Sequence, residues 1–196
     1  MALWRVLCAS GGADTTWVPL LAGAACWVVI FLLLPKPMWI YVFGHELTHA
    51  LWAWLCGGQL RKFKVSSSGG HVVITKSNFL IALAPYFFPL YAVLVTVVFW
   101  LGQWIWHWRH FLVWYHLLVG AAYGFHVTLT AYILKTRQSD FMSQGWLFSA
   151  VIIFLGNACV LLFGVPLLTS NGGWLRGLDW WLADTGRVLA WLQGWF

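Results

Sequence analysis

The sequence predicts an all-α polytopic membrane protein with about five transmembrane helices, a small surface β-hairpin and a C-terminal interfacial amphipathic helix. Hydrophobic residues make up 62% of the 196 residues and charged residues only 8%, whereas soluble domains carry about 25% charged residues. The mean hydropathy is +0.79. The apolar residues gather in five runs, each close to the ~20 residues that a helix needs to cross ~30 Å of hydrocarbon. We expect residues 1–196 to form a single membrane domain.

The five apolar runs are the expected transmembrane helices. The first helix is predicted over 15–34, and it should remain as an anchor, because its apolar run is longer than that of a usual signal peptide and "PKP" follows in place of a cleavage motif. A core of four further helices is predicted over 38–168. The apolar runs themselves are 17–34, 38–56, 79–102, 111–134 and 146–168.

Two further segments are predicted at the membrane surface. In 60–74, apolar residues on both sides of the turn-forming "SSSGG" indicate a two-stranded hairpin. In the tail, 174–196, leucines recur at helical spacing between charged residues, which is typical of an amphipathic helix lying in the interface.

The positive charge of the chain is expected to interact with the membrane and not with nucleic acid. The net charge is +6, from eleven Lys and Arg against five Asp and Glu, and in a membrane protein it reflects cytoplasmic loops and contact with anionic lipid. With five spans, seven basic residues fall on the side of the amino terminus and four on the other. The positive-inside rule then places the amino terminus in the cytoplasm.

The stretch "YVFGHELTHALW" carries the chemistry. Glu46 is the only glutamate, and it lies between His45 and His49 inside an apolar run. Positions i and i+4 share one face of a helix, so the two histidines can bind one metal ion while Glu46 acts as a base. Zn²⁺ suits imidazole ligands and an open tetrahedral site. The alternative is that these are ordinary polar residues satisfied within the bundle, but each ionisable group at bilayer depth costs about 2.5–3.5 kcal/mol on insertion scales.

Three consecutive segments of the chain resemble a known family. "GHELTHALWAWLCGG", the hairpin after it and then "SNFLIALAPYFFPLYAV" are similar to the core of the site-2-protease family of intramembrane zinc metalloproteases, in its short bacterial forms. The resemblance covers roughly 39–165. It implies one Zn²⁺ ion, a bacterial inner membrane, and hydrolysis of a peptide bond in or near the transmembrane segment of a membrane-protein substrate.

The resemblance also implies a third ligand, which in that family is an aspartate at the start of a later span, commonly within "LDG". Here the pattern departs, since Asp140 stands in "RQSDFMSQGWLFSA" with Phe141 in place of the glycine. Asp140 is nevertheless the one remaining carboxylate before a spanning helix on the cytoplasmic side, and it is the predicted third ligand. Its alternative role is that of a residue at a helix N-terminus, stabilised by the helix dipole.

Two other polar residues are candidates for the site. His126 lies at a depth similar to that of His49, so it is a rival third ligand, a residue that supports a metal ligand, a group that binds the substrate carbonyl, or a plain hydrogen-bonded core histidine. Asn78 opens the third span, where the family often has an asparagine near the site. It is a candidate for substrate binding, with helix N-capping as the favoured alternative.

Two other functions remain as alternatives to an intramembrane protease. One is a non-proteolytic membrane metal-binding protein, which has no need of a glutamate beside the first histidine. The other is an inactive protease-like scaffold for a partner, which has no reason to keep His45, Glu46 and His49 together. Because 196 residues leave no room for a soluble sensing domain beside the spans, we also expect a regulatory or adaptor membrane partner, or prior trimming of the substrate.

Overall fold

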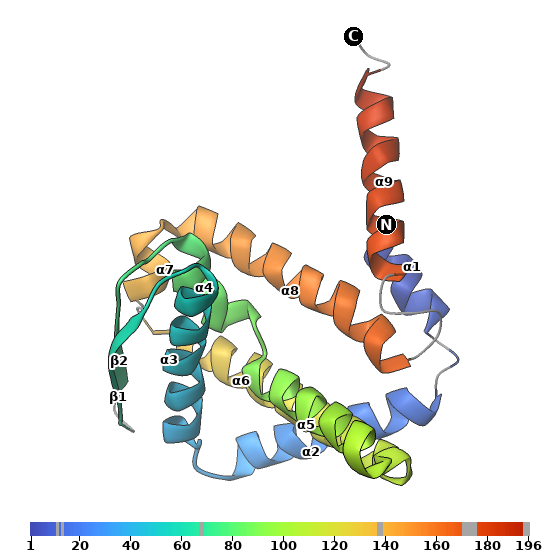
Figure 1. The fold of residues 1–196 in the computed structure, drawn as a ribbon, viewed down its shortest axis with the longest axis horizontal. Coiled ribbons are helices and arrows are strands. Elements are labelled where there is room, and N and C mark those ends of the chain that lie inside the picture. Colours follow the sequence, from blue (N-terminus) through green and yellow to red (C-terminus); the bar gives the residue numbers. More distant parts are fainter. Residues whose placement is uncertain (11, 13, 67–68, 137–138, 170–175, 194–196) are drawn as a thin grey trace.

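The computed structural model describes the whole chain except residues 11, 13, 67–68, 137–138, 170–175 and 194–196 (Figure 1). Helices dominate it, and its one sheet within the described residues is the hairpin of β1 and β2. The elements are, in order, α1 Ala2–Ala9, α2 Asp14–Leu33, α3 Met38–Leu55, β1 Leu60–Ser66, β2 Gly69–Ile74, α4 Phe79–Phe87, α5 Leu90–Trp106, η1 Trp108–Phe111, α6 Leu112–Ile133, α7 Ser139–Ser143, α8 Trp146–Thr169 and α9 Arg176–Gln193.

Three helices in the described part of the chain are long and apolar enough to cross a membrane: Asp14–Leu33, Trp108–Ile133 and Trp146–Thr169. The pair α4 and α5 makes a fourth span if the two are counted as one. The chain is therefore an integral membrane protein, but the predicted count of about five spans is not confirmed. The difference lies in α3, whose two histidines and one glutamate lower the mean hydropathy of an otherwise apolar helix.

The third predicted span, 79–102, consists of two helices with a bend between them. The axes of α4 and α5 differ by 74°. Phe88 is extended, with φ −92° and ψ 107°, and Pro89 follows it. A residue before proline is pushed out of the helical region, and proline has no N–H to continue the helical hydrogen bonds, so the local sequence accounts for the break.

Close packing of α2 against α6 forms one side of the bundle. A Cβ added at Gly23 of α2 would overlap the carbonyl oxygen of Leu117, and one at Gly120 of α6 would overlap the carbonyl oxygen of Leu20. The two backbones can approach this closely only because these positions lack side chains. Small residues at the contact are typical of helix pairs in membranes, where packing replaces the hydrophobic effect as the driving force.

Two apolar clusters hold α3 in place between its neighbours. On one side Tyr41 packs with Phe125 and Leu129 of α6. On the other, Trp52 packs against a buried cluster of α4 that includes Tyr86 and is also covered by residues of α8. With contacts on both sides, the face of α3 that carries the polar residues has a fixed orientation.

The predicted hairpin is present and lies against α3 (Figure 1). Strands β1 and β2 pair antiparallel, with Phe63 opposite Val72, and an irregularity lies between Leu60 and Lys62. The turn residues Ser67 and Ser68 lie outside the described residues. A two-stranded hairpin in 60–74 is thus confirmed, and its place at the membrane surface stays a prediction.

The C-terminal tail forms α9, which projects away from the other helices beside α1 (Figure 1). Arg5 of α1 pairs with Asp184 of α9 at 3.5 Å, and Trp180 packs on the cluster of α1 and α8 residues that contains Val6. Helix α1 was not predicted. The ends of the predicted interfacial helix, 174–175 and 194–196, lie outside the described residues, and its position in the interface stays a prediction.

Candidate metal centre

Helix α3 brings three ionisable side chains onto its inner surface. The side chains of His45 and His49 are 10% and 9% exposed, and Glu46 is 8% exposed. The helix ends at Leu55. Gly57 then adopts φ +74°, and the amide of Gly58 donates to the carbonyl of Ala53 at 2.7 Å. This glycine-rich end turns the chain back along α3, which is why the hairpin lies beside the same three residues.

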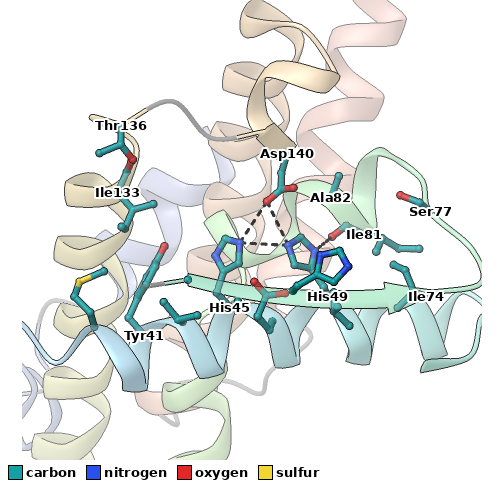
Figure 2. Close-up of a pocket in the computed structure, with 17 residues that line it drawn as sticks. Tyr41, His45, His49, Ile74, Ser77, Ile81, Ala82, Ile133, Thr136 and Asp140 are labelled. Carbon is teal, nitrogen blue, oxygen red and sulfur yellow. Dashed lines mark hydrogen bonds and ion pairs between the residues drawn. The ribbon is translucent and has the colours of Figure 1, made fainter. Parts of the chain in front are cut away.

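A carboxylate from a distant part of the chain meets the two imidazoles (Figure 2). Asp140 lies on the short helix α7, and its Oδ2 is 3.4 Å from the Nε2 atoms of both His45 and His49. The two Nε2 atoms are 3.2 Å apart. Within the described residues, His45, His49 and Asp140 form a group that could hold a metal ion.

The spacing of these three atoms fits a tetrahedral zinc ion. Bonds of about 2.0–2.1 Å in a tetrahedron separate neighbouring ligand atoms by about 3.3–3.4 Å. The three distances here are 3.2, 3.4 and 3.4 Å. Two imidazole nitrogens and one carboxylate oxygen are also a ligand set that catalytic zinc sites use, with the fourth position left for water or substrate.

Contacts around the three residues fix their orientation. The Nδ1–H of His49 donates to the carbonyl of Ile81 at 2.8 Å, so the neutral ring, the form that binds a metal, has its unprotonated Nε2 turned toward the other two groups. The Tyr86 hydroxyl donates to Asp140 Oδ2 at 3.4 Å. Partners of this kind hold metal-binding side chains in one tautomer and rotamer.

The charge of Asp140 suits binding of a cation. Burial alone would raise the pKa of its carboxyl, but hydrogen bonds and charge attraction from His45 and His49 outweigh burial and hold the pKa below its usual range. Asp140 is therefore ionised at neutral pH. It offers a negative charge to balance part of the charge of a bound ion, in a place where an unpaired cation would be costly.

The three residues face a cavity of about 650 Å³, and Glu46 lines the same cavity. Strand β2 forms another wall through Gly69, Gly70 and His71. At Gly70 the strand passes directly over Glu46, because an added Cβ would lie 2.6 Å from Glu46 Oε1 and 2.7 Å from its Cδ. A glycine is needed there for the strand and the glutamate to lie this close.

The other two candidates lie apart from this group. Asn78 caps α4, where its Oδ1 accepts from the amide of Ile81 at 2.9 Å, and it is not among the residues that line the large cavity. His126 is 8% exposed and is not part of the His–His–Asp group. It lines a second, smaller cavity, which it shares with His45.

Three contacts of the site were not predicted from sequence. The sequence "APYFFP" predicts only that Tyr86 belongs to an apolar span, whereas the structure places its hydroxyl in contact with Asp140. The carbonyl of Ile81 and the close approach of Gly70 to Glu46 involve backbone atoms, which no side-chain motif encodes. From the sequence, the glycines after "SSS" are predicted only to form the turn.

The helices and the cluster together define a class of protein: a helical integral membrane protein with a histidine and aspartate group suited to a metal ion. Residues 16–169 match the model of a family described as Peptidase M50B-like. Because the match spans most of the chain, the chain belongs to this family, which confirms the resemblance to site-2-proteases and implies a metal-dependent peptidase. Comparison with curated proteins and with solved structures found no match.

Proposed function

We propose that the protein is an intramembrane zinc metalloprotease that hydrolyses a peptide bond in or near the transmembrane segment of a membrane-protein substrate. His45, His49 and Asp140 hold the zinc ion, and Glu46 is the catalytic base. The observation that carries the proposal is the set of 3.2–3.4 Å separations among the three ligand atoms, which match the edges of a zinc tetrahedron beside the cavity that Glu46 lines.

Zinc bound there supplies Lewis acidity, which polarises a carbonyl and brings the pKa of water toward about 7. The Glu46 carboxylate accepts a proton from the attacking water and later delivers it to the departing amine. The Ile81 carbonyl keeps the proton of His49 on Nδ1, and Tyr86 holds the carboxylate of Asp140. Because the site is mostly buried, these fixed groups act in an environment of low dielectric, which strengthens each of them.

The substrate must be extended where it is cut, because helical hydrogen bonds shield its carbonyls. Strand β2 lines the cavity, and within the described part of the chain it pairs only with β1, along one edge. Its other edge is suited to pair with an unwound substrate segment, as in other cases of strand addition. The break at Phe88 and Pro89 is a place where α4 and α5 can move apart to admit such a segment from the lipid.

The proposed setting is a bacterial inner membrane with the amino terminus in the cytoplasm, in keeping with the excess of basic residues on that side. The partners are the lipid bilayer, a membrane-protein substrate and a regulatory or adaptor membrane protein. No nucleic acid is proposed as a partner, because contact with anionic lipid accounts for the positive charge of a membrane protein.

Replacing Glu46 with Gln tests the proposal. The purified protein in detergent is incubated with a set of apolar transmembrane peptides, and mass spectrometry identifies the cleaved bonds. Glu46→Gln should abolish cleavage, because an amide cannot accept the proton, while zinc content stays at the level of the unaltered protein. Asp14→Asn makes the same carboxyl-to-amide change away from the site and should cleave normally. Cleavage by Glu46→Gln at the normal rate would remove the protease assignment. If the unaltered protein binds zinc but cleaves no peptide, a non-proteolytic metal-binding protein would be favoured.

A further inference from the structure

The two imidazoles of the metal centre differ in whether the Nδ1 atom of the ring has a hydrogen-bond partner. His49 Nδ1 donates to the Ile81 carbonyl at 2.8 Å. His45 Nδ1 is buried and has no hydrogen-bond partner among the described residues. A histidine that binds a metal through Nε2 carries its proton on Nδ1, and this N–H is almost always given to a carboxylate, a carbonyl or a water. His45 therefore needs a partner that is not a protein side chain or backbone group in direct contact.

A small cavity borders His45. Its volume is about 20 Å³, and its lining includes His45 and Thr48 of α3 and His126 of α6. This is room for one water molecule, which is stable in a buried site only if it finds two to four polar partners. The large cavity that Glu46 lines is a separate space, although His45 borders both.

His126 is the second polar group that the cavity needs. It is 8% exposed, and no side-chain hydrogen bond joins its ring to another part of the described chain. Its neighbours Phe125 and Leu129 are packed into the cluster with Tyr41 of α3, so α6 holds the ring of His126 in place beside α3. A water in the cavity can therefore join the unpaired Nδ1–H of His45 to one ring nitrogen of His126.

We propose that His126 is a positioning residue that acts on the metal centre through a single bound water. The water accepts the Nδ1–H of His45 and donates one hydrogen to the unprotonated ring nitrogen of His126. Its second hydrogen goes to the Thr48 hydroxyl oxygen, whose own proton is given to the Gly44 carbonyl at 2.7 Å. This arrangement keeps the proton of His45 on Nδ1 and leaves Nε2 free for zinc, as the Ile81 carbonyl does for His49. The inference rests on the proposed metal site and excludes His126 from the zinc ligands.

The zinc dissociation constant of purified full-length protein, measured by competition with a chromophoric chelator, tests the inference. His126→Leu should weaken zinc binding by about 10–100-fold, the usual effect of removing a partner of a ligand histidine. His126→Gln, which can still accept from and donate to the water, should restore most of the affinity. His116→Leu is the matched control, because His116 is also on α6 and 2% exposed but contacts the Thr15 carbonyl; its zinc affinity should not change.

Each other outcome overturns the inference. If His126→Leu binds zinc as tightly as the unaltered protein, or if His116→Leu loses as much affinity, His126 does not act on the site. If His126→Leu fails to fold, an experimental density map of the unaltered protein decides, since it should contain an ordered water between His45 and His126, and a dry cavity refutes the proposal. Unaltered protein that binds no zinc would remove the proposed function as well, whereas the outcomes above leave that function standing.

Discussion

Gly70→Ala should separate catalysis from metal binding. The added Cβ would lie 2.6 Å from Glu46 Oε1 and 2.7 Å from Glu46 Cδ, whereas ordinary contacts begin at 3.4 Å. The new Cβ would come closer still to Glu46 Cγ. The strand or the glutamate must therefore move by about 1 Å, and a misplacement of about 1 Å in a catalytic group costs on the order of 100-fold in rate. None of the three ligand atoms is among the atoms that the new methyl group meets first. We expect the cleavage rate to fall about 100-fold while zinc affinity is kept.

The assay is the peptide cleavage assay described for Glu46, combined with the zinc dissociation constant of the same preparations. Gly69→Ala is the control, because its Cβ would meet nothing within 4 Å although its φ of +150° makes any side chain strained there. Gly69→Ala strains the hairpin backbone without placing an atom against Glu46, so it measures the effect of strain alone. It should reduce the cleavage rate only a few-fold. A Gly70→Ala protein that cleaves at the normal rate would show that β2 does not lie over Glu46 in the active enzyme.

Two further predictions concern the support of the site and of the bundle. Tyr86→Phe removes the hydroxyl that donates to Asp140 and should raise the zinc dissociation constant about 10-fold, whereas Tyr115→Phe, a buried tyrosine away from the site, should leave it unchanged; equal values for both variants would contradict the role of Tyr86. Gly120→Ala puts a methyl group onto a backbone carbonyl of α2 and should lower the free energy of unfolding by about 1–3 kcal/mol, seen as a lower melting temperature in detergent. Gly164→Ala, whose Cβ meets nothing within 4 Å, is its control, and equal melting temperatures would argue against close packing of α2 and α6.

The parts of the site that follow from local sequence could be predicted. The i, i+4 spacing of His45 and His49 places both on one face of any helix, and the apolar run around them predicts that helix. Asp140 came from its position before a later span, and the structure places it 3.4 Å from both histidines. Its role as a ligand stays a proposal until a metal is measured.

Other features depend on tertiary contacts that a single sequence does not encode. The close approach of Gly70 to Glu46 arises only when the hairpin folds back on α3. The contact of Tyr86 with Asp140 joins residues 54 positions apart. The 74° bend between α4 and α5 had a local signal in Pro89, but the size of a bend depends on the helices packed around it.

Zinc bound to the unaltered protein and to Asp140→Ala is the most direct test of the central claim. Zinc X-ray absorption on the unaltered protein should report a single four-coordinate ion with two imidazole ligands and oxygen ligands at about 2.0–2.2 Å. Asp140→Ala should bind zinc far more weakly, while Asp179→Ala, on α9, should bind it normally. Zinc that is absent from the unaltered protein, or that is bound equally well without the Asp140 carboxylate, would contradict the account.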